Sequence, residues 1–377
     1  MSFIKLIFLI LFLIFLLEIV FRILVKLIFG RSYELSPRFN KKNLYVIDHP
    51  YLPFVLKENS VSNPKLVASY PLHKGKIFLP SVNHGSLGFA TGKKGNEIIE
   101  IPKPKHIKRI CCLGASTTGN YVGNIEKNVY TSYPLELEKY LRKITKNKNI
   151  QVVNCGIGGS NSADLLIRYS LQIIDMQPDI LIMHHGHNDI YNYLTKGFKS
   201  DYSHSVKGLS RSMYKFKLAS FIPYIPLKSI QYIINLFLPI RGVHNNLLKL
   251  TRIGKFDLNQ EYETGLSIYK RNLQSIIDIA KARGTKIILV TFAHYLYDDI
   301  KKSKLHNKFA EIIKAENNIM RELAIHNDLK IVDNEKNMPK ETKYFVDSIH
   351  FTMEGMKRLA LNIGKVIYKD LKITLDI

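Results

Sequence analysis

The chain has 377 residues, enough to bury one large core, and its 46% hydrophobic and 23% charged residues exclude an intrinsically disordered protein. Its net charge of +24 is spread along the whole sequence, without the arginine-rich tract that would follow a phosphate backbone, so we predict no nucleic-acid partner. The basic residues instead predict a solvated surface suited to anionic lipid or polysaccharide. Three cysteines, Cys111, Cys112 and Cys155, are too few for a disulfide framework, and we expect them as small buried hydrophobes.

Residues 1–30 are predicted to be an N-terminal membrane anchor. Residues 3–25 are almost wholly apolar, and as a transmembrane helix they would reach about 34 Å, enough to cross a bilayer core. No small-residue cleavage site follows, which favours an uncleaved anchor over a removed signal peptide. The uninterrupted apolar run from Leu6 to Leu17 is short, so a helix that lies in the membrane interface is the alternative.

Basic residues flank the apolar stretch unequally. One lysine, Lys5, precedes most of it, whereas several basic side chains lie at its end or just beyond, at Arg22, Lys26, Arg31 and Arg38. The positive-inside rule therefore favours a cytoplasmic position for the rest of the chain.

Residues 31–105 show no sustained helical period and contain scattered prolines, glycines and asparagines. We predict an extended lead-in with short strands, packed on the main domain. The prolines at 102 and 104 end this segment, because proline neither continues a helix nor occupies a central strand.

From residue 106 onward, strand-like apolar runs alternate with helical patterns. The strands are predicted at residues 107–113, 151–155, 180–184, 286–292 and 329–332. The helices are predicted at residues 133–144, 162–176, 261–283, 304–325 and 353–371. This alternation favours right-handed crossovers and a parallel sheet covered on both faces, so we predict a three-layer α/β domain over residues 106–377.

An insertion at about residues 196–255 interrupts this alternation. Within it, residues 221–240 are apolar and aromatic and are divided by prolines. The segment is interpreted either as a lid or second membrane contact, or as a plain packing subdomain.

The carboxyl ends of parallel strands are where ligands bind in such sheets. The first strand ends in Gly114-Ala115-Ser116, and a serine at a strand-to-helix turn can project its hydroxyl outward. A helix N-cap serine is the common alternative for this pattern.

The second strand is followed by a glycine-rich loop, Gly156-Ile157-Gly158-Gly159, whose backbone N–H groups can approach an anion. Its spacing matches neither common phosphate-binding pattern. The third strand ends in His184-His185-Gly186-His187-Asn188-Asp189. The Asn188 amide is a suitable oxyanion donor, whereas His184 and His185 point to opposite faces of a strand, so we predict no metal site.

Asp347 and His350 stand three residues apart before the last helix, a spacing that suits a carboxylate orienting an imidazole. Asp333, at the end of the fifth strand, is the rival carboxylate partner.

Together these four blocks resemble the SGNH (GDSL-like) serine hydrolase family. The resemblance covers residues 107–370, in the family's order. It implies a triad of Ser116, Asp347 and His350, and an oxyanion hole formed by Ser116, Gly159 and Asn188. It also implies a flavodoxin-like, five-stranded parallel sheet. The family's usual Gly-Asp-Ser reads Gly-Ala-Ser here, which leaves the nucleophile in place.

The resemblance implies an esterase without a cofactor, acting on O-acyl (acetyl) esters of a glycan or lipid. The alternatives are an acyltransferase that passes the acyl group to a glycan hydroxyl, and a catalytically inactive anchored glycan-binding protein. The lead-in segment 83–89 is also similar to segments before the first block in membrane-anchored members. Because anchored members commonly act on envelope material, the resemblance favours an extracytoplasmic catalytic domain, against the flanking charges.

Overall fold

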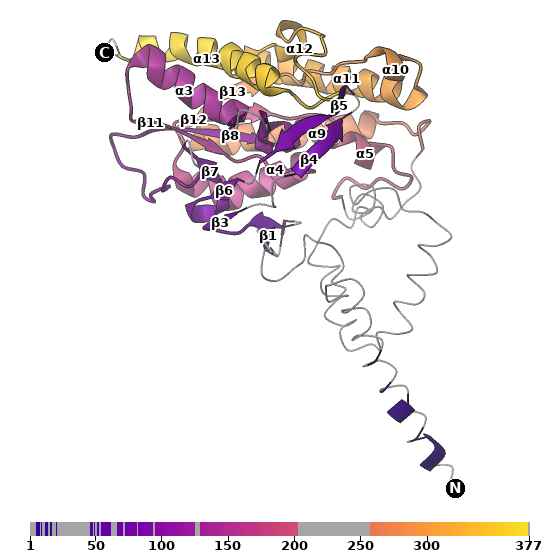
Figure 1. Cartoon of the computed structure of the whole chain (residues 1–377). Helices are drawn as coiled ribbons and strands as arrows, with labels where there is room; N and C mark the ends of the chain where they lie inside the picture. The colour runs from indigo at the N-terminus through magenta and orange to yellow at the C-terminus, as the bar shows by residue number, and fades with distance from the viewer. Residues whose placement is uncertain are drawn as a thin grey trace. The chain divides into compact units, whose positions relative to one another are not determined.

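The computed structural model describes residues 46–202 and 257–375 with short gaps, and a few scattered residues before residue 46. The gaps are at residues 48, 50, 53, 62–65, 71, 81, 93–94 and 125–128. The chain divides into two compact units, and the larger one contains every strand and helix named below (Figure 1). The smaller unit includes the predicted anchor and most of the predicted insertion, so these two predictions fall largely outside the described residues.

No helix in the part of the chain that the structure describes is both long and apolar enough to cross a membrane. The few described residues of the N-terminal apolar stretch, among them Leu6, Phe12 and Leu16, are helical and have exposed side chains.

The larger unit is built on a six-stranded sheet of order β14-β13-β12-β8-β11-β7. Its strands are β7 (Ala90–Thr91), β8 (Lys108–Gly114), β11 (Ile150–Asn154), β12 (Ile180–His184), β13 (Lys286–Val290) and β14 (Lys330–Val332). The five predicted strands pair in parallel in the flavodoxin-like order, which confirms that part of the prediction. The prediction of a wholly parallel sheet is wrong at one edge. There β7, from the lead-in, pairs antiparallel with β11 through Thr91 and Val153, and the sheet is mixed.

Side chains of each strand alternate between two separate cores. On β8, Cys111 and Leu113 pack into one hydrophobic cluster, whereas Ile110 and Cys112 pack into the other. Both faces are therefore buried, which is why these strands read as continuous apolar runs in the sequence. The three cysteines are buried free thiols, as predicted.

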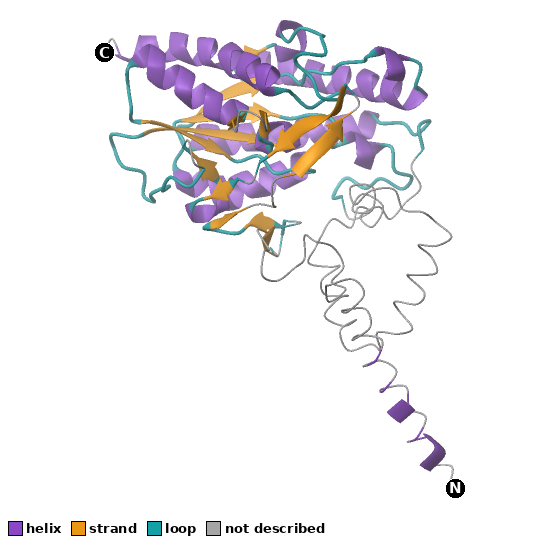
Figure 2. Ribbon diagram, viewed as in Figure 1, coloured by secondary structure: helices purple, strands orange, loops and turns teal. Residues whose placement is uncertain are grey.

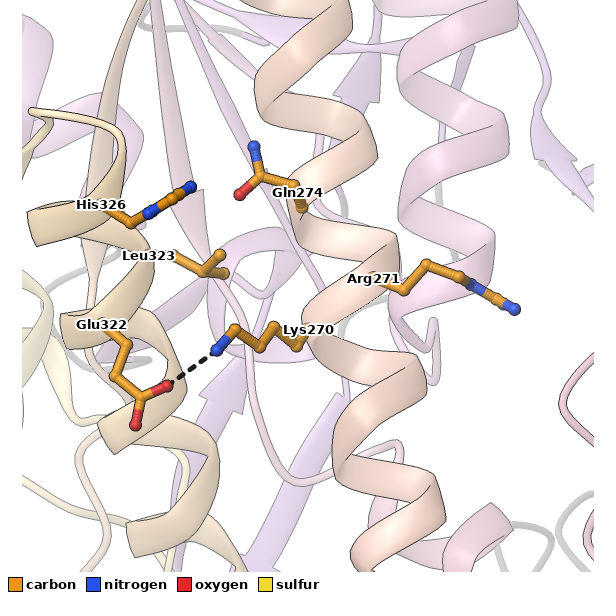
Figure 3. A pocket seen from close by; sticks show the side chains of 6 residues that line it. All are labelled: Lys270, Arg271, Gln274, Glu322, Leu323 and His326. Atoms are coloured by element: carbon orange, nitrogen blue, oxygen red, sulfur yellow. Dashed lines mark hydrogen bonds and ion pairs between the residues drawn. The ribbon is translucent and has the colours of Figure 1, made fainter.

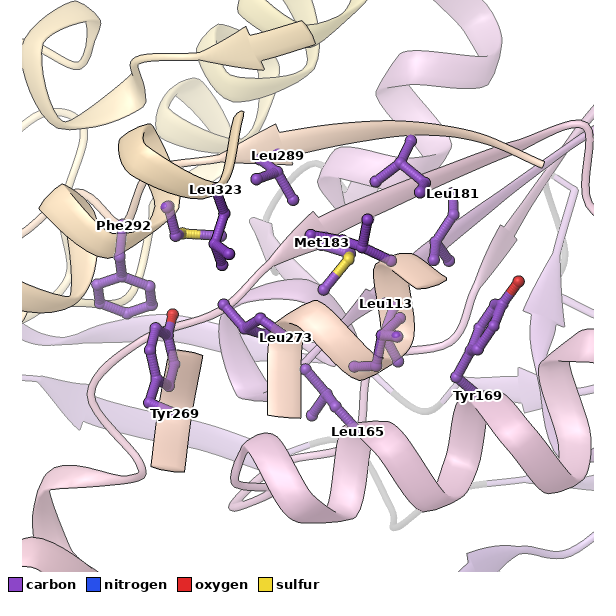
Figure 4. Packing of buried hydrophobic residues seen from close by; sticks show 14 of the residues in the cluster. Leu113, Leu165, Tyr169, Leu181, Met183, Tyr269, Leu273, Leu289, Phe292 and Leu323 are labelled. Atoms are coloured by element: carbon purple, nitrogen blue, oxygen red, sulfur yellow. The ribbon is translucent and has the colours of Figure 1, made fainter. Parts of the chain in front are cut away.

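Helices cover both faces, and the domain has the three predicted layers (Figure 2). One face is covered by α4 (Ser162–Arg168), α9 (Glu263–Ala282) and α11 (Lys304–His326). The opposite face is covered by α3 (Tyr133–Thr145) and α13 (Met353–Leu375). Figure 4 shows the first of these cores, in which Leu165 of α4 and Leu273 of α9 meet Leu113 and Met183 of the sheet.

The helix predicted over residues 162–176 is not a single α-helix. It begins with a capping box, in which the Asn161 side chain accepts from Asp164 N and the Asp164 carboxylate accepts from Asn161 N, both at 2.9 Å. After α4 the chain continues as a π-helical turn, η3 (Tyr169–Ile173), and a 3-10 turn, η4 (Ile174–Met176).

Short elements complete the connections between the main strands and helices. They are η2 (Ser86–Gly88), α2 (Ser116–Gly119), α5 (Ile190–Tyr193), α10 (Asp298–Lys301) and α12 (Asn334–Asn337).

The lead-in consists of short strands, in agreement with its sequence pattern. They are β1 (Val46–Ile47), β2 (Val55–Leu56), β3 (Ser60–Val61), β4 (Leu66–Tyr70), β5 (His73–Leu79) and β6 (Asn83–His84). A second sheet of order β10-β9-β5-β4 joins this segment to β9 (Val122–Asn124) and β10 (Val129–Thr131), through Phe78 opposite Gly123. The lead-in therefore pairs with the loop that follows the Ser116 turn.

Candidate active site

Ser116 lies where β8 turns into α2, at the carboxyl edge of the parallel sheet. The turn is tight, because the N–H groups of Thr118 and Gly119 both donate to the Ala115 carbonyl, at 3.1 and 2.8 Å. Ser116 itself is half-buried at the start of this turn. The serine is thus held on a short, fixed segment at the edge where ligands of α/β sheets bind.

The imidazole of His350 meets this serine although 234 residues separate them. His350 Nε2 lies 2.9 Å from Ser116 Oγ, and His350 Nδ1 lies 2.8 Å from Asp347 Oδ2. Burial opposes ionisation of Asp347, but the charge of His350 and hydrogen bonds from His350 and Ile349 outweigh it and lower the pKa of this carboxyl to about 2. Asp347 is therefore a carboxylate at neutral pH and fixes the orientation of the ring.

The rival carboxylate, Asp333, has other partners. Its Oδ1 lies 2.8 Å from Arg321 Nη2 and 3.1 Å from Thr291 Oγ1, and Lys336 lies 3.3 Å from its other oxygen. These contacts occupy Asp333 in an ion-pair cluster, whereas Asp347 contacts the imidazole.

The loop that carries Asp347 and His350 is fixed from several directions. Val346 N donates to His350 O at 2.8 Å, and Tyr295 N donates to Ser348 O at 2.9 Å. His73, the first residue of β5, lies with its Nε2 2.9 Å from Phe345 O and 3.1 Å from Thr342 O. Since both partners are acceptors, Nε2 must carry the proton. His73 is not among the residues predicted from the sequence, because a lone histidine in an extended segment gives no signal of a contact 272 residues away.

The glycine-rich loop after β11 lies against the Ser116 turn. A side chain on Gly156 would collide with the backbone of Gly119, at the end of α2. The glycine-rich loop and the Ser116 turn therefore pack backbone against backbone. Gly159 has a φ of +80°, which glycine adopts without strain. This packing explains the glycines that the sequence shows between residues 156 and 159.

Asn188 lies at the third strand end, after a residue in an unusual conformation. His187 has a φ of +72°, a left-handed value that is disfavoured for a residue with a side chain. The side-chain Nδ2 of Asn188 donates to the carbonyl of Ser160 at 2.9 Å. This hydrogen bond fixes the amide and ties the third loop to the second.

The three histidines around Asn188 point to different surroundings. His184 is enclosed by the rings of Tyr133, Phe292 and Phe351, and burial lowers its pKa to about 3. His185 Nε2 lies 2.7 Å from Asp189. Among the described residues, no group of three or more histidine, cysteine, aspartate or glutamate side chains is placed to hold a metal ion.

A buried polar network lies behind Asn188. Asp189 accepts from Ser162 N at 2.8 Å, from Ser162 Oγ at 2.7 Å and from the Tyr202 hydroxyl at 2.7 Å, and Asn272 Nδ2 donates to Ser162 Oγ at 2.9 Å. Burial disfavours the charge of Asp189, but these hydrogen bonds and that of His185 lower its pKa. This network was not predicted from the sequence, although Asp189 stands beside Asn188 in the third block.

A cavity of about 520 Å³ opens between α9 and α11 (Figure 3). Its lining includes Lys270 and Glu322, which form an ion pair of 2.9 Å, and no residue of the Ser116 and His350 pair. Charged side chains at an open groove are typical of a solvated helix surface.

Three solved structures illustrate what the chain is similar to. A lipase/acylhydrolase from Enterococcus faecalis is 17% identical, with a TM-score of 0.41, over 69% of this chain and 95% of that chain. A GDSL-like lipase from Bacteroides thetaiotaomicron is 16% identical, with a TM-score of 0.39, over 70% and 89%. An acetylxylan esterase from Geobacillus stearothermophilus is 16% identical, with a TM-score of 0.41, over 68% and 92%.

A comparison with curated proteins gives no match. The model of the GDSL-like lipase/acylhydrolase family matches residues 112–358, which is well over half of the chain and includes Ser116, Asn188 and His350. The family assignment rests on this match. The chain belongs to the GDSL-like lipase/acylhydrolase family and is a hydrolase that acts on ester bonds.

Proposed function

We propose that this ester hydrolase uses Ser116 as its nucleophile, His350 as its general base and Asp347 as the carboxylate that orients the base. The supporting observation is the continuous chain of contacts from Ser116 Oγ to His350 Nε2, 2.9 Å, and from His350 Nδ1 to Asp347, 2.8 Å. Ser116 attacks the ester carbonyl carbon while His350 takes its proton, and His350 then gives that proton to the leaving alcohol. Water, activated by the same imidazole, releases the acid.

The negative charge that develops on the carbonyl oxygen needs nearby donors. We propose that the backbone N–H groups of Ser116 and Gly159 and the side-chain amide of Asn188 form this oxyanion hole. Their loops converge, since Gly156 packs on the Ser116 turn and Asn188 is bonded to Ser160. One such donor is typically worth about 3 kcal/mol of the barrier.

For the substrate we propose a short O-acyl ester, such as an acetyl ester, on an anionic glycan, with a lipid ester as the second choice. The net charge of +24 favours an anionic polymer, and the apolar N-terminal stretch favours work at a membrane surface. We also propose that residues 3–25 anchor the chain, because their described residues are helical with exposed apolar side chains. An envelope substrate implies that the catalytic domain lies outside the cytoplasm.

Hydrolysis of p-nitrophenyl acetate tests the assignment of the triad. We expect Ser116→Ala to abolish turnover and fluorophosphonate labelling without unfolding the protein, and Asp347→Asn to lower kcat by about 10³- to 10⁴-fold, because the amide favours the wrong tautomer of His350. The control is Asp333→Asn, which removes the rival carboxylate and should keep kcat. Full turnover by Ser116→Ala would remove this serine from the mechanism. Addition of a glycan acceptor with product analysis separates hydrolysis from acyl transfer.

A further inference from the structure

The helix α11 carries two adjacent polar residues in the middle of its buried face. Glu316 and Asn317 are both fully buried. Neither faces solvent, and each is hydrogen-bonded to the backbone of a loop that follows a strand of the sheet. Polar groups in such a position normally persist because of the hydrogen bonds that they make.

Asn317 holds the segment that follows β13. Its Oδ1 accepts from Phe292 N at 2.6 Å, and its Nδ2 donates to Phe292 O at 2.9 Å. One side chain therefore pairs both backbone groups of Phe292, as a neighbouring strand would. The ring of Phe292 in turn stacks on His187, with ring centroids 6.5 Å apart and an angle of 7° between the rings.

Glu316 holds His187 directly. Its Oε2 accepts from His187 N at 3.1 Å, at the residue whose φ is +72°. A left-handed conformation of a residue other than glycine persists where its surroundings fix it. The backbone of His187 determines the direction in which the next residue, Asn188, leaves the strand, and the Asn188 amide then donates to Ser160 O at 2.9 Å.

Glu316 serves as a hydrogen-bond acceptor for the His187 N–H rather than as a charged group. Burial and the negative charge of Asp189 raise the pKa of Glu316 well above its usual range and so disfavour the charged carboxylate. A hydrogen bond with the Tyr193 side chain offsets part of this rise in the pKa. A leucine could fill this space but would leave the His187 N–H without its acceptor, so packing alone does not account for a glutamate here.

We propose that Glu316 is a positioning residue for ester hydrolysis: by accepting the His187 N–H, it holds the loop that aims the Asn188 amide at the carbonyl oxygen of the substrate. Asn317 supports the same arrangement through Phe292. This inference rests on the proposed function, in which Asn188 is an oxyanion donor. Glu316 touches neither substrate nor Ser116 and acts only through Asn188.

Steady-state hydrolysis of p-nitrophenyl acetate by the full chain in mild detergent tests this role. We expect Glu316→Leu, which removes the acceptor, to lower kcat by about 10- to 100-fold with little change in KM, as for a small misplacement of a catalytic group. Glu316→Gln keeps a carbonyl oxygen and should stay within about threefold of the wild type. The matched control is Glu322→Leu, an exposed position on the same helix. A loss in Glu316→Gln as large as that in Glu316→Leu would overturn the proposal.

A double-mutant cycle with Asn188→Ala separates positioning from a general effect on the fold. If Glu316 acts through Asn188, Glu316→Leu should lower kcat by less than about threefold in the Asn188→Ala background. An equal loss in both backgrounds would show that Glu316 does not act through the amide. Full activity of Asn188→Ala or Ser116→Ala would instead contradict the proposed function, so the two failures are distinguishable.

A measurement on the wild-type protein keeps the proposal testable should Glu316→Leu not fold. Residue-resolved amide hydrogen exchange should find the His187 N–H as protected as the amides of β12. Exchange of this amide at the rate of an open loop would mean that Glu316 does not hold it, and would overturn the inference.

Discussion

His184 shows how a histidine can be locked in its neutral form by its surroundings. The ring is fully buried, and the rings of Tyr133, Phe292 and Phe351 lie within 6.3 Å of it, measured between ring centroids. Neither ring nitrogen has a hydrogen-bond partner among the described residues. Burial lowers the pKa of His184 to about 3, so the folded protein keeps this ring uncharged at any ordinary pH.

This shift makes stability depend on pH. The pKa is lowered on folding, so the unfolded chain binds the proton more readily, and stability is lost as pH falls from about 6.5 towards 3. For this one residue the loss between pH 7 and pH 5 is about 2 kcal/mol. We expect His184→Phe, which fits the aromatic surroundings, to reduce the difference in unfolding free energy between these pH values by that amount. Denaturant unfolding at both pH values measures the two free energies of unfolding. If His184→Phe left their difference unchanged, the lowered pKa of His184 would be contradicted.

Short motifs made part of the site predictable at the level of single residues. Asp347 and His350 are close in sequence, and Ser116 follows a strand, so a local pattern could select them as candidates. His73 and Glu316 reach the site from 269 and 129 residues away. No spacing in the sequence marks such contacts, because tertiary folding alone creates them.

Among the secondary-structure elements, the lead-in has the least expected role. Its strand β5 begins at His73, whose imidazole spans the carbonyl oxygens of Thr342 and Phe345 just before Asp347. The same strand pairs with β9, in the loop after Ser116. A segment that precedes the family match at residue 112 therefore contacts both the loop after Ser116 and the loop before Asp347.

Replacement of His73 tests this contact. We expect His73→Ala to lower kcat about three- to tenfold, because loss of a hydrogen bond of about 1 kcal/mol loosens the Asp347 loop. KM should change little, and the melting temperature should fall by a few degrees. The exposed His106, just after the lead-in, provides the control substitution His106→Ala. Unchanged kcat and melting temperature in His73→Ala would mean that the loop carrying Asp347 keeps its position without the His73 contact.

The sequence predicted the main strands and helices well, because each carries a strong apolar pattern. It did not predict β7, which has only two residues and pairs through backbone groups. Nor did it predict the π-helical turn from Tyr169 to Ile173, since its residues continue the apolar pattern of the preceding helix. Elements whose formation depends on strand register or hydrogen-bond pattern, rather than on residue composition, are difficult to predict from a single sequence.

For the whole molecule, the proposed topology is open to a direct test. A membrane-impermeant fluorophosphonate added to intact cells that express the chain should label Ser116 if the catalytic domain lies outside the cytoplasm. Cells that express Ser116→Ala provide the control for specific labelling. Labelling that appears only after lysis would place the catalytic domain in the cytoplasm, the position that the positive-inside rule favours.

The short strand β7 also limits how far the chain can be truncated from its N-terminal side. It is the only partner that β11 has on its outer side among the described residues, through Val153 and Asn154. A fragment trimmed to the family boundary at residue 112 would begin inside β8 and would lack β7 altogether. The N–H and C=O groups of β11 would then be open to a strand from a second molecule, a known route to aggregation.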